Sequence, residues 1–195
     1  MTLIEPNLIR RQIALYARRV KELEAELLGA RTQLNEDALT GTLNRRGLRQ
    51  ACEDFPLSVE DGVTVVSCVV LDLDNFKWIN DQYGHAIGDE ALVYFSQFLR
   101  THIRPIDTIA RLGGDEFVLI MADMAGRDAV DTVRRLIRSL AECPFLTPVV
   151  PQPLSLSAGI AELRTEETMY DAMVRADSAL LSAKRSGKSQ VVLEL

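Results

Sequence analysis

The sequence lacks the features of membrane proteins and of disulfide-stabilised secreted proteins. Its 195 residues contain no apolar run near the roughly 20 residues of a membrane-spanning helix, and the N-terminus lacks the apolar core of a signal peptide. Only three cysteines occur, Cys52, Cys68 and Cys143, an odd number without close pairing. Because Cys68 lies in an apolar segment, we expect free thiols in a reducing cytoplasm.

Positive charge is also scarce. The chain has 22 Lys and Arg against 28 Asp and Glu, which gives a formal net charge of −6. A generic nucleic-acid-binding protein needs a basic face to neutralise phosphates, so this class is disfavoured. An acidic protein still binds a polyphosphate when a divalent metal ion lies between carboxylate and phosphate. The histidines, His85 and His102, do not have the spacing of metal ligands, and we expect both to make structural hydrogen bonds.

A heptad pattern occupies the N-terminal part of the chain. Its spacing alternates between four and three residues and predicts a helix of about 28 residues, roughly 40 Å long, with a narrow apolar seam. We favour a two-stranded coiled coil; the alternative is that the helix folds back onto the rest of the chain. We therefore divide the chain into an N-terminal helix, residues 1–36, and a catalytic-size domain, residues 37–195. The seam positions are Ile9, Ile13, Tyr16, Val20, Leu23, Leu27, Ala30 and Leu34.

The remaining residues predict alternating strands and helices. Thr40-Gly41 ends the first helix, and Thr42 or Asn44 is suited to cap the next one. The Val-rich residues 63–73 show little alternation, as in a central strand covered on both faces. This order of elements predicts an α+β fold with a mixed, largely antiparallel central sheet flanked by helices. The other elements are helices at 48–55, 75–81, 90–103, 128–140 and 166–186 and strands at 107–110, 117–121, 154–160 and 191–195.

One segment carries two adjacent carboxylates in a tight turn, Arg111-Leu112-Gly113-Gly114-Asp115-Glu116-Phe117. Its apolar flanks indicate a β-hairpin, because glycine adopts positive φ without steric cost. Neighbouring side chains of a strand point to opposite faces, so one of the two carboxylates should face the working surface of the sheet. The plainer interpretation is an ordinary turn with solvated acidic residues. The buried strand at 63–73 also ends in carboxylates, Asp72-Leu73-Asp74, which are placed as metal ligands are placed.

Four segments in this order resemble the diguanylate cyclases, a family named for its Gly-Gly-Asp-Glu-Phe (GGDEF) motif. The resemblance covers nearly all of the chain from Asp37 onward, in segments 37–46, 72–89, 111–117 and 176–187. The second and third are the most specific, since they hold Asp-x-Asp-x-Phe-Lys-x-Ile-Asn-Asp, Gly-His, Gly-Asp and the whole hairpin motif. The resemblance implies a fold similar to nucleotidyl cyclases and polymerase palm domains. It also implies condensation of two GTP molecules into cyclic di-GMP with release of two pyrophosphates.

The same resemblance implies roles for individual residues. Asp72, the main-chain carbonyl of Leu73 and Asp115 would hold Mg²⁺ or Mn²⁺, which stabilises the charge that develops on the α-phosphate. Asp115 or Glu116 would help to remove the proton of the ribose 3′-hydroxyl, and the sequence leaves both open. The substrate-binding positions, which read guanine or hold phosphates, are Asn75, Phe76, Lys77, Asn80, Asp89, Gly113, Gly114, Lys184 and Lys188.

Two further segments bear on regulation and affinity. Arg104-Pro105-Ile106-Asp107 resembles the inhibitory product site of the family, Arg-x-x-Asp, and Arg135 matches a second arginine of that site. The alternative is that Arg104 is a solvated surface residue. The chain departs from the family at Gly187-Lys188-Ser189, where Gly-Arg-Asn is common. Because lysine cannot make the bidentate phosphate contact of arginine, weaker GTP binding is one expectation.

Three functions are compatible with the resemblance. The first is an active diguanylate cyclase that works as a homodimer, in which the coiled coil raises the effective concentration of two catalytic domains. The second is a non-catalytic cyclic di-GMP receptor that signals to a protein partner; it is disfavoured because the metal carboxylates and the turn glycines are all present. The third is a cyclase with altered base choice, which is disfavoured because Asp89 is present. Nucleic acid is not an expected partner, and we expect no membrane span in this chain.

Overall fold

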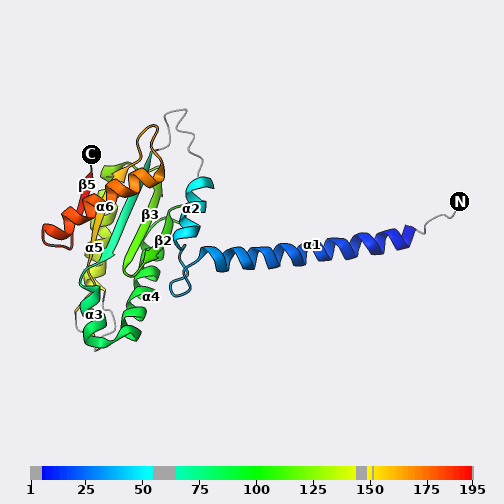
Figure 1. The fold of residues 1–195 in the computed structure, drawn as a ribbon, viewed down its shortest axis with the longest axis horizontal. Coiled ribbons are helices and arrows are strands. Elements are labelled where there is room, and N and C mark those ends of the chain that lie inside the picture. The colour runs from blue at the N-terminus through cyan, green and yellow to red at the C-terminus, as the bar shows by residue number, and fades with distance from the viewer. Residues whose placement is uncertain (1–5, 55–64, 144–148, 151, 195) are drawn as a thin grey trace.

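The computed structural model describes residues 6–54, 65–143, 149–150 and 152–194, and a five-stranded sheet forms its centre (Figure 1). The strands follow the order β2-β3-β1-β4-β5. Neighbouring strands are antiparallel except for β4 and β5, which are parallel. The predicted mixed, largely antiparallel sheet is thus confirmed. The strands are β1 Val66–Leu73, β2 Thr108–Gly113, β3 Glu116–Ala122, β4 Leu156–Glu162 and β5 Val191–Glu194.

β1 is a central strand because both of its faces are covered. All of its residues are buried, and it lies between β3 and β4. Val69 and Leu71 enter the core on one face of the sheet, whereas Cys68 and Val70 enter the core on the other. A strand that is buried on both faces needs no alternation of polar and apolar residues, which explains the nearly continuous apolar run before Asp72. The prediction of a central strand is confirmed.

Helices cover both faces of the sheet. α3, α4 and α5 lie on one face, where Phe95 and Phe117 meet edge to face with ring centroids 5.0 Å apart. α2 and α6 lie on the other face, where Leu48 and Leu180 pack against strand residues (Figure 1). The helices are α2 Arg45–Asp54, α3 Phe76–Tyr83, α4 His85–His102, α5 Gly126–Glu142 and α6 Met169–Arg185.

α2 and α4 begin three and five residues earlier than the sequence predicted, at positions 45 and 85 rather than 48 and 90. α2 begins at Arg45 because Asn44 caps it, with the side-chain oxygen of Asn44 accepting a hydrogen bond from the N–H of Gly47 at 2.9 Å. Thr42, the other candidate cap, instead pairs its Oγ1 with that of Thr40 at 2.9 Å. α4 begins at His85 because Gly84, at φ 85°, lets the chain turn immediately after α3.

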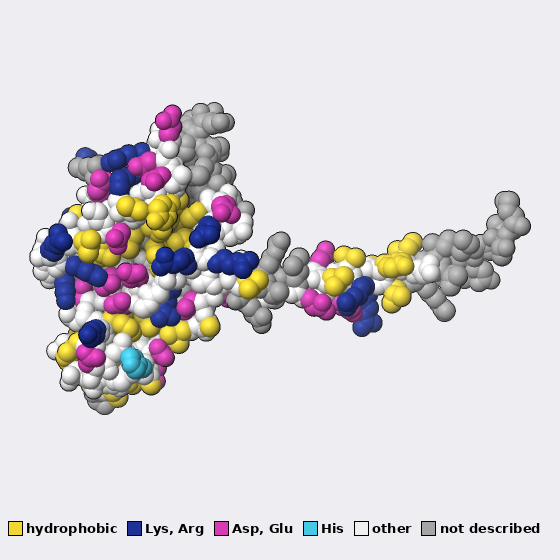
Figure 2. Space-filling view, in the orientation of Figure 1, with side chains coloured by type: hydrophobic (Ala, Val, Ile, Leu, Met, Phe, Trp, Pro, Cys, Tyr) yellow, Lys and Arg dark blue, Asp and Glu magenta, His cyan; other side chains and the backbone are white. Residues whose placement is uncertain are grey.

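α1, Pro6–Asn35, extends away from the sheet (Figure 1). Five seam side chains remain exposed: Ile13 by 62%, Tyr16 by 68%, Val20 by 52%, Leu23 by 46% and Leu34 by 51%. Figure 2 shows apolar side chains along this helix with nothing packed on them. The helix therefore does not fold back onto the sheet in this structure. None of the described helices is both long and apolar enough to span a membrane.

Asp37 joins the end of α1 to the hairpin. Its Oδ1 accepts hydrogen bonds from the N–H of Thr40 at 2.9 Å, the hydroxyl of Thr40 at 2.7 Å and Nη1 of Arg111 at 2.9 Å. Although burial opposes the change, these bonds lower the pKa of Asp37 below its usual value. Since Arg111 belongs to β2, the junction is tied directly to the strand that leads into the acidic turn.

The cysteines and His102 agree with the predictions made for them. Cys52, Cys68 and Cys143 are free, and burial raises the pKa of the Cys68 thiol to about 12. The ring of His102 stacks on Phe98, and its Nδ1 lies 2.8 Å from the carbonyl oxygen of the same residue. His102 is therefore a structural residue at the end of α4.

Candidate active site

The carboxylates at the end of β1 and in the turn between β2 and β3 come together. Asp72 lies opposite Glu116 in the β1–β3 register, so their side chains lie on the same face of the sheet. The N–H of Leu73 points to the carbonyl oxygen of Asp115 at 3.4 Å, which brings the turn against the end of β1. The turn passes through Gly114 at φ 53°, a value that favours glycine. The predicted hairpin is confirmed, and both of its carboxylates lie near Asp72.

Asp72 is a carboxylate in a largely buried, charged environment. Its side chain is 8% exposed, and Nζ of Lys184 from α6 lies 2.6 Å from its Oδ2. Burial, together with the negative charges of Asp115 and Glu116, raises the pKa of Asp72 to about 6, although a hydrogen bond from Lys184 opposes this. Burial and two like charges therefore disfavour the ionised form of Asp72, and an added cation would stabilise it.

The donor atoms at this end of the sheet fit a hard divalent cation. Asp72, Asp115 and the main-chain carbonyl of Leu73 carry oxygen atoms, the ligand type that Mg²⁺ and Mn²⁺ prefer. Among the described residues, no three acidic, histidine or cysteine side chains are already grouped as a metal site. Water or nucleotide oxygens would therefore complete the coordination, as is usual for Mg²⁺.

The segment after β1 meets the loop that follows α6. Asn75 has a left-handed conformation, φ 59° and ψ 24°, and immediately precedes the first turn of α3. Nζ of Lys188 donates to Oδ1 of Asn75 at 2.7 Å. Phe76 is buried, whereas Lys77 is exposed to solvent. The predicted phosphate-binding residues, from distant parts of the sequence, are thus neighbours, and Lys184 reaches the same end of β1.

Asn80 and Asp89 lie at the junction of two helices. Asn80 of α3 packs so closely on Gly88 of α4 that a Cβ at Gly88 would lie 1.9 Å from its Oδ1. Asp89, the next residue along α4, is exposed. The absence of a side chain at Gly88 lets α3 and α4 approach each other, which brings both predicted guanine-binding residues to one junction.

Arg104 and Asp107 form a close pair away from this cluster. Nη2 of Arg104 donates to Oδ1 of Asp107 and to the carbonyl oxygen of Ala122, both at 2.6 Å. The side chain of Asp107 is only 1% exposed, and that of Arg104 39%, so Arg104 is more than a solvated surface residue. A cavity of about 320 Å³ adjoins the pair. Arg135 is an exposed residue of α5, and no hydrogen bond or ion pair joins it to the pair in the described part of the chain.

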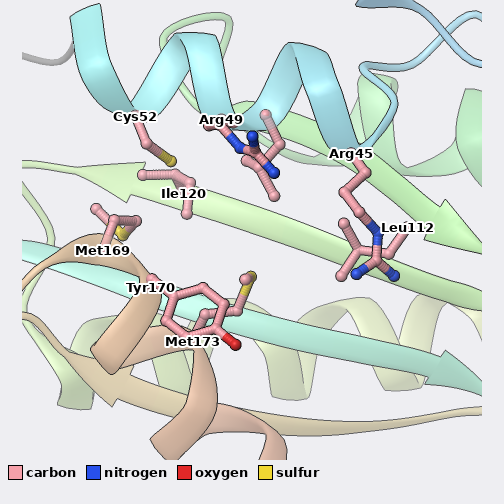
Figure 3. A pocket seen from close by; sticks show the side chains of 9 residues that line it. Arg45, Arg49, Cys52, Leu112, Ile120, Met169, Tyr170 and Met173 are labelled. Atoms are coloured by element: carbon pink, nitrogen blue, oxygen red, sulfur yellow. The ribbon is translucent and has the colours of Figure 1, made fainter.

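An apolar cavity between α2 and α6 was not predicted. It has a volume of about 150 Å³, and Figure 3 shows side chains of both helices pointing toward the space above β3. Because its residues come from three separate parts of the chain, no local sequence pattern indicates it. None of the predicted site residues belongs to the lining, which consists of Arg45, Leu48, Arg49, Cys52, Leu112, Ile120, Met169, Tyr170 and Met173.

Known proteins are similar to this chain in both sequence and fold. The family profile described as "Diguanylate cyclase, GGDEF domain" matches residues 34–190. The diguanylate cyclase DgcP of Pseudomonas aeruginosa is 35% identical over 88% of the chain and 26% of its own length. The response regulator PleD of Caulobacter vibrioides is 36% identical over 80% of the chain and 35% of its own length. The chain thus spans roughly a quarter to a third of these relatives.

Two solved structures are similar to nearly the whole chain, so that each match includes most of α1. The coiled coil and GGDEF domain of DgcB from Caulobacter crescentus, in complex with c-di-GMP, has a TM-score of 0.84 at 27% identity and covers 95% of this chain and 99% of its own. The diguanylate cyclase SiaD from Pseudomonas aeruginosa, in complex with its activator SiaC, has a TM-score of 0.78 at 32% identity. That match covers 96% of this chain and 74% of SiaD.

Proposed function

The chain belongs to the diguanylate cyclase GGDEF-domain family, and we propose that it joins two GTP molecules into cyclic di-GMP with release of two pyrophosphates. The convergence of Asp72, Asp115 and Glu116 at one end of the sheet, with two lysines beside them, carries this proposal. Attack of a ribose 3′-hydroxyl on an α-phosphate needs anionic ligands for a cation and cationic groups for the phosphates. Both kinds of group meet at this site.

Asp72, Asp115 and the carbonyl of Leu73 would hold Mg²⁺ or Mn²⁺. Such a cation, when bound, stabilises charge on the α-phosphate and lowers the pKa of a coordinated hydroxyl. The raised pKa of Asp72 supports this assignment, because burial and the nearby charges of Asp115 and Glu116 disfavour its ionised form, which a bound cation would stabilise. Asp115 or Glu116 would accept the proton that leaves the 3′-hydroxyl, since both carboxylates lie near Asp72.

Guanine recognition is assigned to the junction of α3 and α4. The carboxylate of Asp89 would accept hydrogen bonds from N1–H and from the amino group of guanine, with Asn80 as its neighbour. Adenine lacks these donors and would leave the carboxylate unpaired, so the site would discriminate against ATP. The exposure of Asp89 and the close approach of its helix to Asn80 support this assignment.

The phosphates would lie between the start of α3 and the end of α6. The main-chain N–H groups of Asn75 and Phe76 lie at the N-terminus of α3. The N-terminus of a helix favours anions. Lys77, Lys184 and Lys188 add positive charge beside them. The turn glycines, Gly113 and Gly114, are exposed and would let the nucleotide approach the main chain.

The product needs two nucleotide sites facing each other, and each chain supplies one, so we assign the active form to a homodimer. The exposed seam of α1 supports this, because an apolar stripe of this length is stabilised by a second helix. The division into a pairing helix, residues 1–36, and a catalytic domain, residues 37–195, belongs to the same proposal.

Arg104 and Asp107 are assigned to product inhibition, with Arg135 of the same or another chain as a further contact. A guanidinium binds a phosphate or a guanine edge, and the adjoining cavity leaves room for a ligand. Arg104→Ala should keep its initial rate and lose inhibition by added cyclic di-GMP. Progress curves with added product test this, and equal inhibition of parent and variant would contradict it.

Incubation with GTP or ATP plus Mg²⁺, followed by identification of products, tests the main proposal. Asp72→Asn and Asp115→Asn should each lower cyclic di-GMP synthesis by at least about a hundredfold, because each removes a charged ligand from the reacting phosphate. Melting temperatures should stay near that of the parent, and Asp177→Asn, at an exposed carboxylate of α6, serves as the control. A parent that binds cyclic di-GMP without making it would instead be a receptor.

A further inference from the structure

Asp74 is a buried carboxylate to which the proposed function assigns no role. Asp74 is 6% exposed, and each of its two carboxylate oxygens accepts a hydrogen bond from the protein. Oδ1 accepts from the hydroxyl of Ser157 on β4 at 2.7 Å, and Oδ2 accepts from the N–H of Ser189 at 2.9 Å. The main-chain N–H of Asp74 also donates to the carbonyl oxygen of Ser155 at 2.8 Å. Asp74 therefore fixes the loop after α6 to the end of β1 and to β4.

The loop that Asp74 holds has an unfavourable main-chain conformation. Lys188 and Ser189 have φ of 64° and 48°, and they follow Gly187 at φ 116°. Two consecutive residues with side chains in the left-handed region persist only when surrounding contacts enforce this conformation. One such contact is the bond from the N–H of Ser189 to Asp74.

The same loop carries cationic groups to the candidate active site. Lys188 reaches Oδ1 of Asn75 at 2.7 Å, and Lys184, in the last turn of α6, reaches Asp72 at 2.6 Å. Asn75 follows Asp74 directly and is itself left-handed. The buried carboxylate thus lies beneath the place where the two phosphate-binding segments meet.

We propose that Asp74 is a positioning residue, which holds the loop of Gly187 to Ser189 so that Lys188 stays beside the phosphate-binding turn. This inference rests on the proposed function for the identity of the ligand, a nucleoside triphosphate. Asp74 acts through the N–H of Ser189, whereas Asp72 acts through its charge on the cation. The two carboxylates, although two residues apart, should therefore respond differently to loss of charge.

The substitution Asp74→Asn separates these roles. Its amide oxygen can accept from the N–H of Ser189 while its amide nitrogen donates to the hydroxyl of Ser157, which is able to accept as well as donate. Asp74→Asn should keep the loop in place and retain GTP affinity within about twofold, because both hydrogen bonds survive without the charge. Asp74→Ala removes both and should weaken the binding of α,β-methylene-GTP about tenfold.

Relief of the strained conformation provides a second test. Glycine adopts φ near 48° freely, so Ser189→Gly in the Asp74→Ala background should recover most of the lost affinity. Ser189→Gly alone should bind as the parent does, and Asp177→Ala is a matched control at an exposed carboxylate. A general loss of structure would not be reversed by a glycine in this loop.

Calorimetric affinity for α,β-methylene-GTP, with KM and kcat for GTP, decides the proposal. Asp74→Ala should raise KM more than it lowers kcat. If Asp74→Asn loses activity as Asp72→Asn does, or if Asp74→Ala binds the analogue as the parent does, the positioning role is wrong. Should Asp74→Ala fail to fold, the Asp74→Asn result still decides. Absence of cyclic di-GMP synthesis by the parent would count against the proposed function, while analogue affinities would still test Asp74.

Discussion

Asp72 and Asp74 have the same type of side chain but different roles, because their surroundings differ. Asp72 is paired with a lysine side chain and lies near two further carboxylates, so an added cation relieves its repulsion. Asp74 is bound by a serine hydroxyl and by a main-chain N–H, so its carboxylate stabilises a loop. Residue type alone does not distinguish the two, whereas their hydrogen-bond partners do.

Asp89 should set the choice of base. Asp89→Ser removes the acceptor for the two donors of guanine, and hydrogen bonds to a charged group contribute about 1.5–3 kcal/mol. The ratio of kcat/KM for GTP over ATP should therefore fall roughly 10- to 100-fold. Glu90→Ser, at the next exposed residue of α4, is the control and should leave the ratio unchanged. A parental ratio in Asp89→Ser would show that this residue does not contact the base.

Local patterns predicted the elements, since each pattern reflects how a segment is buried. The Val-rich run before Asp72 indicated a strand covered on both faces, and the structure places β1 at the centre of the sheet. Contacts between segments that are distant in the sequence could not be predicted from local patterns. The pairing of Lys184 with Asp72 depends on where α6 crosses the sheet, and it was not predicted, since the family resemblance placed Lys184 only among the substrate-binding residues. The bonds of Asp74 and the cavity beside α2 have no sequence pattern at all.

Gly159 decides where α6 crosses the sheet. A Cβ at this position in β4 would lie 1.9 Å from the carbonyl oxygen of Ala176 and 2.2 Å from the N of Leu180, both in the main chain of α6. Gly159→Ala should therefore lower the free energy of unfolding by about 3 kcal/mol or more, since a helix main chain cannot move aside as a side chain can.

Urea denaturation of the purified variant measures this effect, with Gly29→Ala as the matched glycine control. A Cβ at Gly29 meets nothing within 4 Å, and alanine there should favour α1 by up to about 1 kcal/mol. Because α6 also carries Lys184, Gly159→Ala should reduce activity at temperatures where the protein remains folded. An unchanged unfolding midpoint would show that α6 is less closely packed on β4 than described.

At the scale of the whole molecule, an exposed helix is joined to a well-packed domain through few contacts. The apolar seam of α1 lies in solvent, while Asp37 links the end of this helix to Arg111 in the strand that leads to the acidic turn. A change in the pairing of α1 is therefore connected to the hairpin that carries Asp115 through the partly buried Asp37–Arg111 ion pair and through main-chain hydrogen bonds between Leu43 and β2.

Val20→Lys together with Leu23→Lys should disrupt pairing of the helix. Each substitution places a charge in the apolar seam and removes a side chain whose burial in a dimer contributes about 2 kcal/mol. The dissociation constant of the dimer should rise at least about a hundredfold, and activity per chain should fall at low protein concentration and recover as concentration increases. Sedimentation velocity and rates over a dilution series measure both. Ala14→Lys with Leu15→Lys adds the same charge outside the seam and should behave as the parent. A parent that sediments as a monomer at micromolar concentration would contradict the coiled-coil pairing.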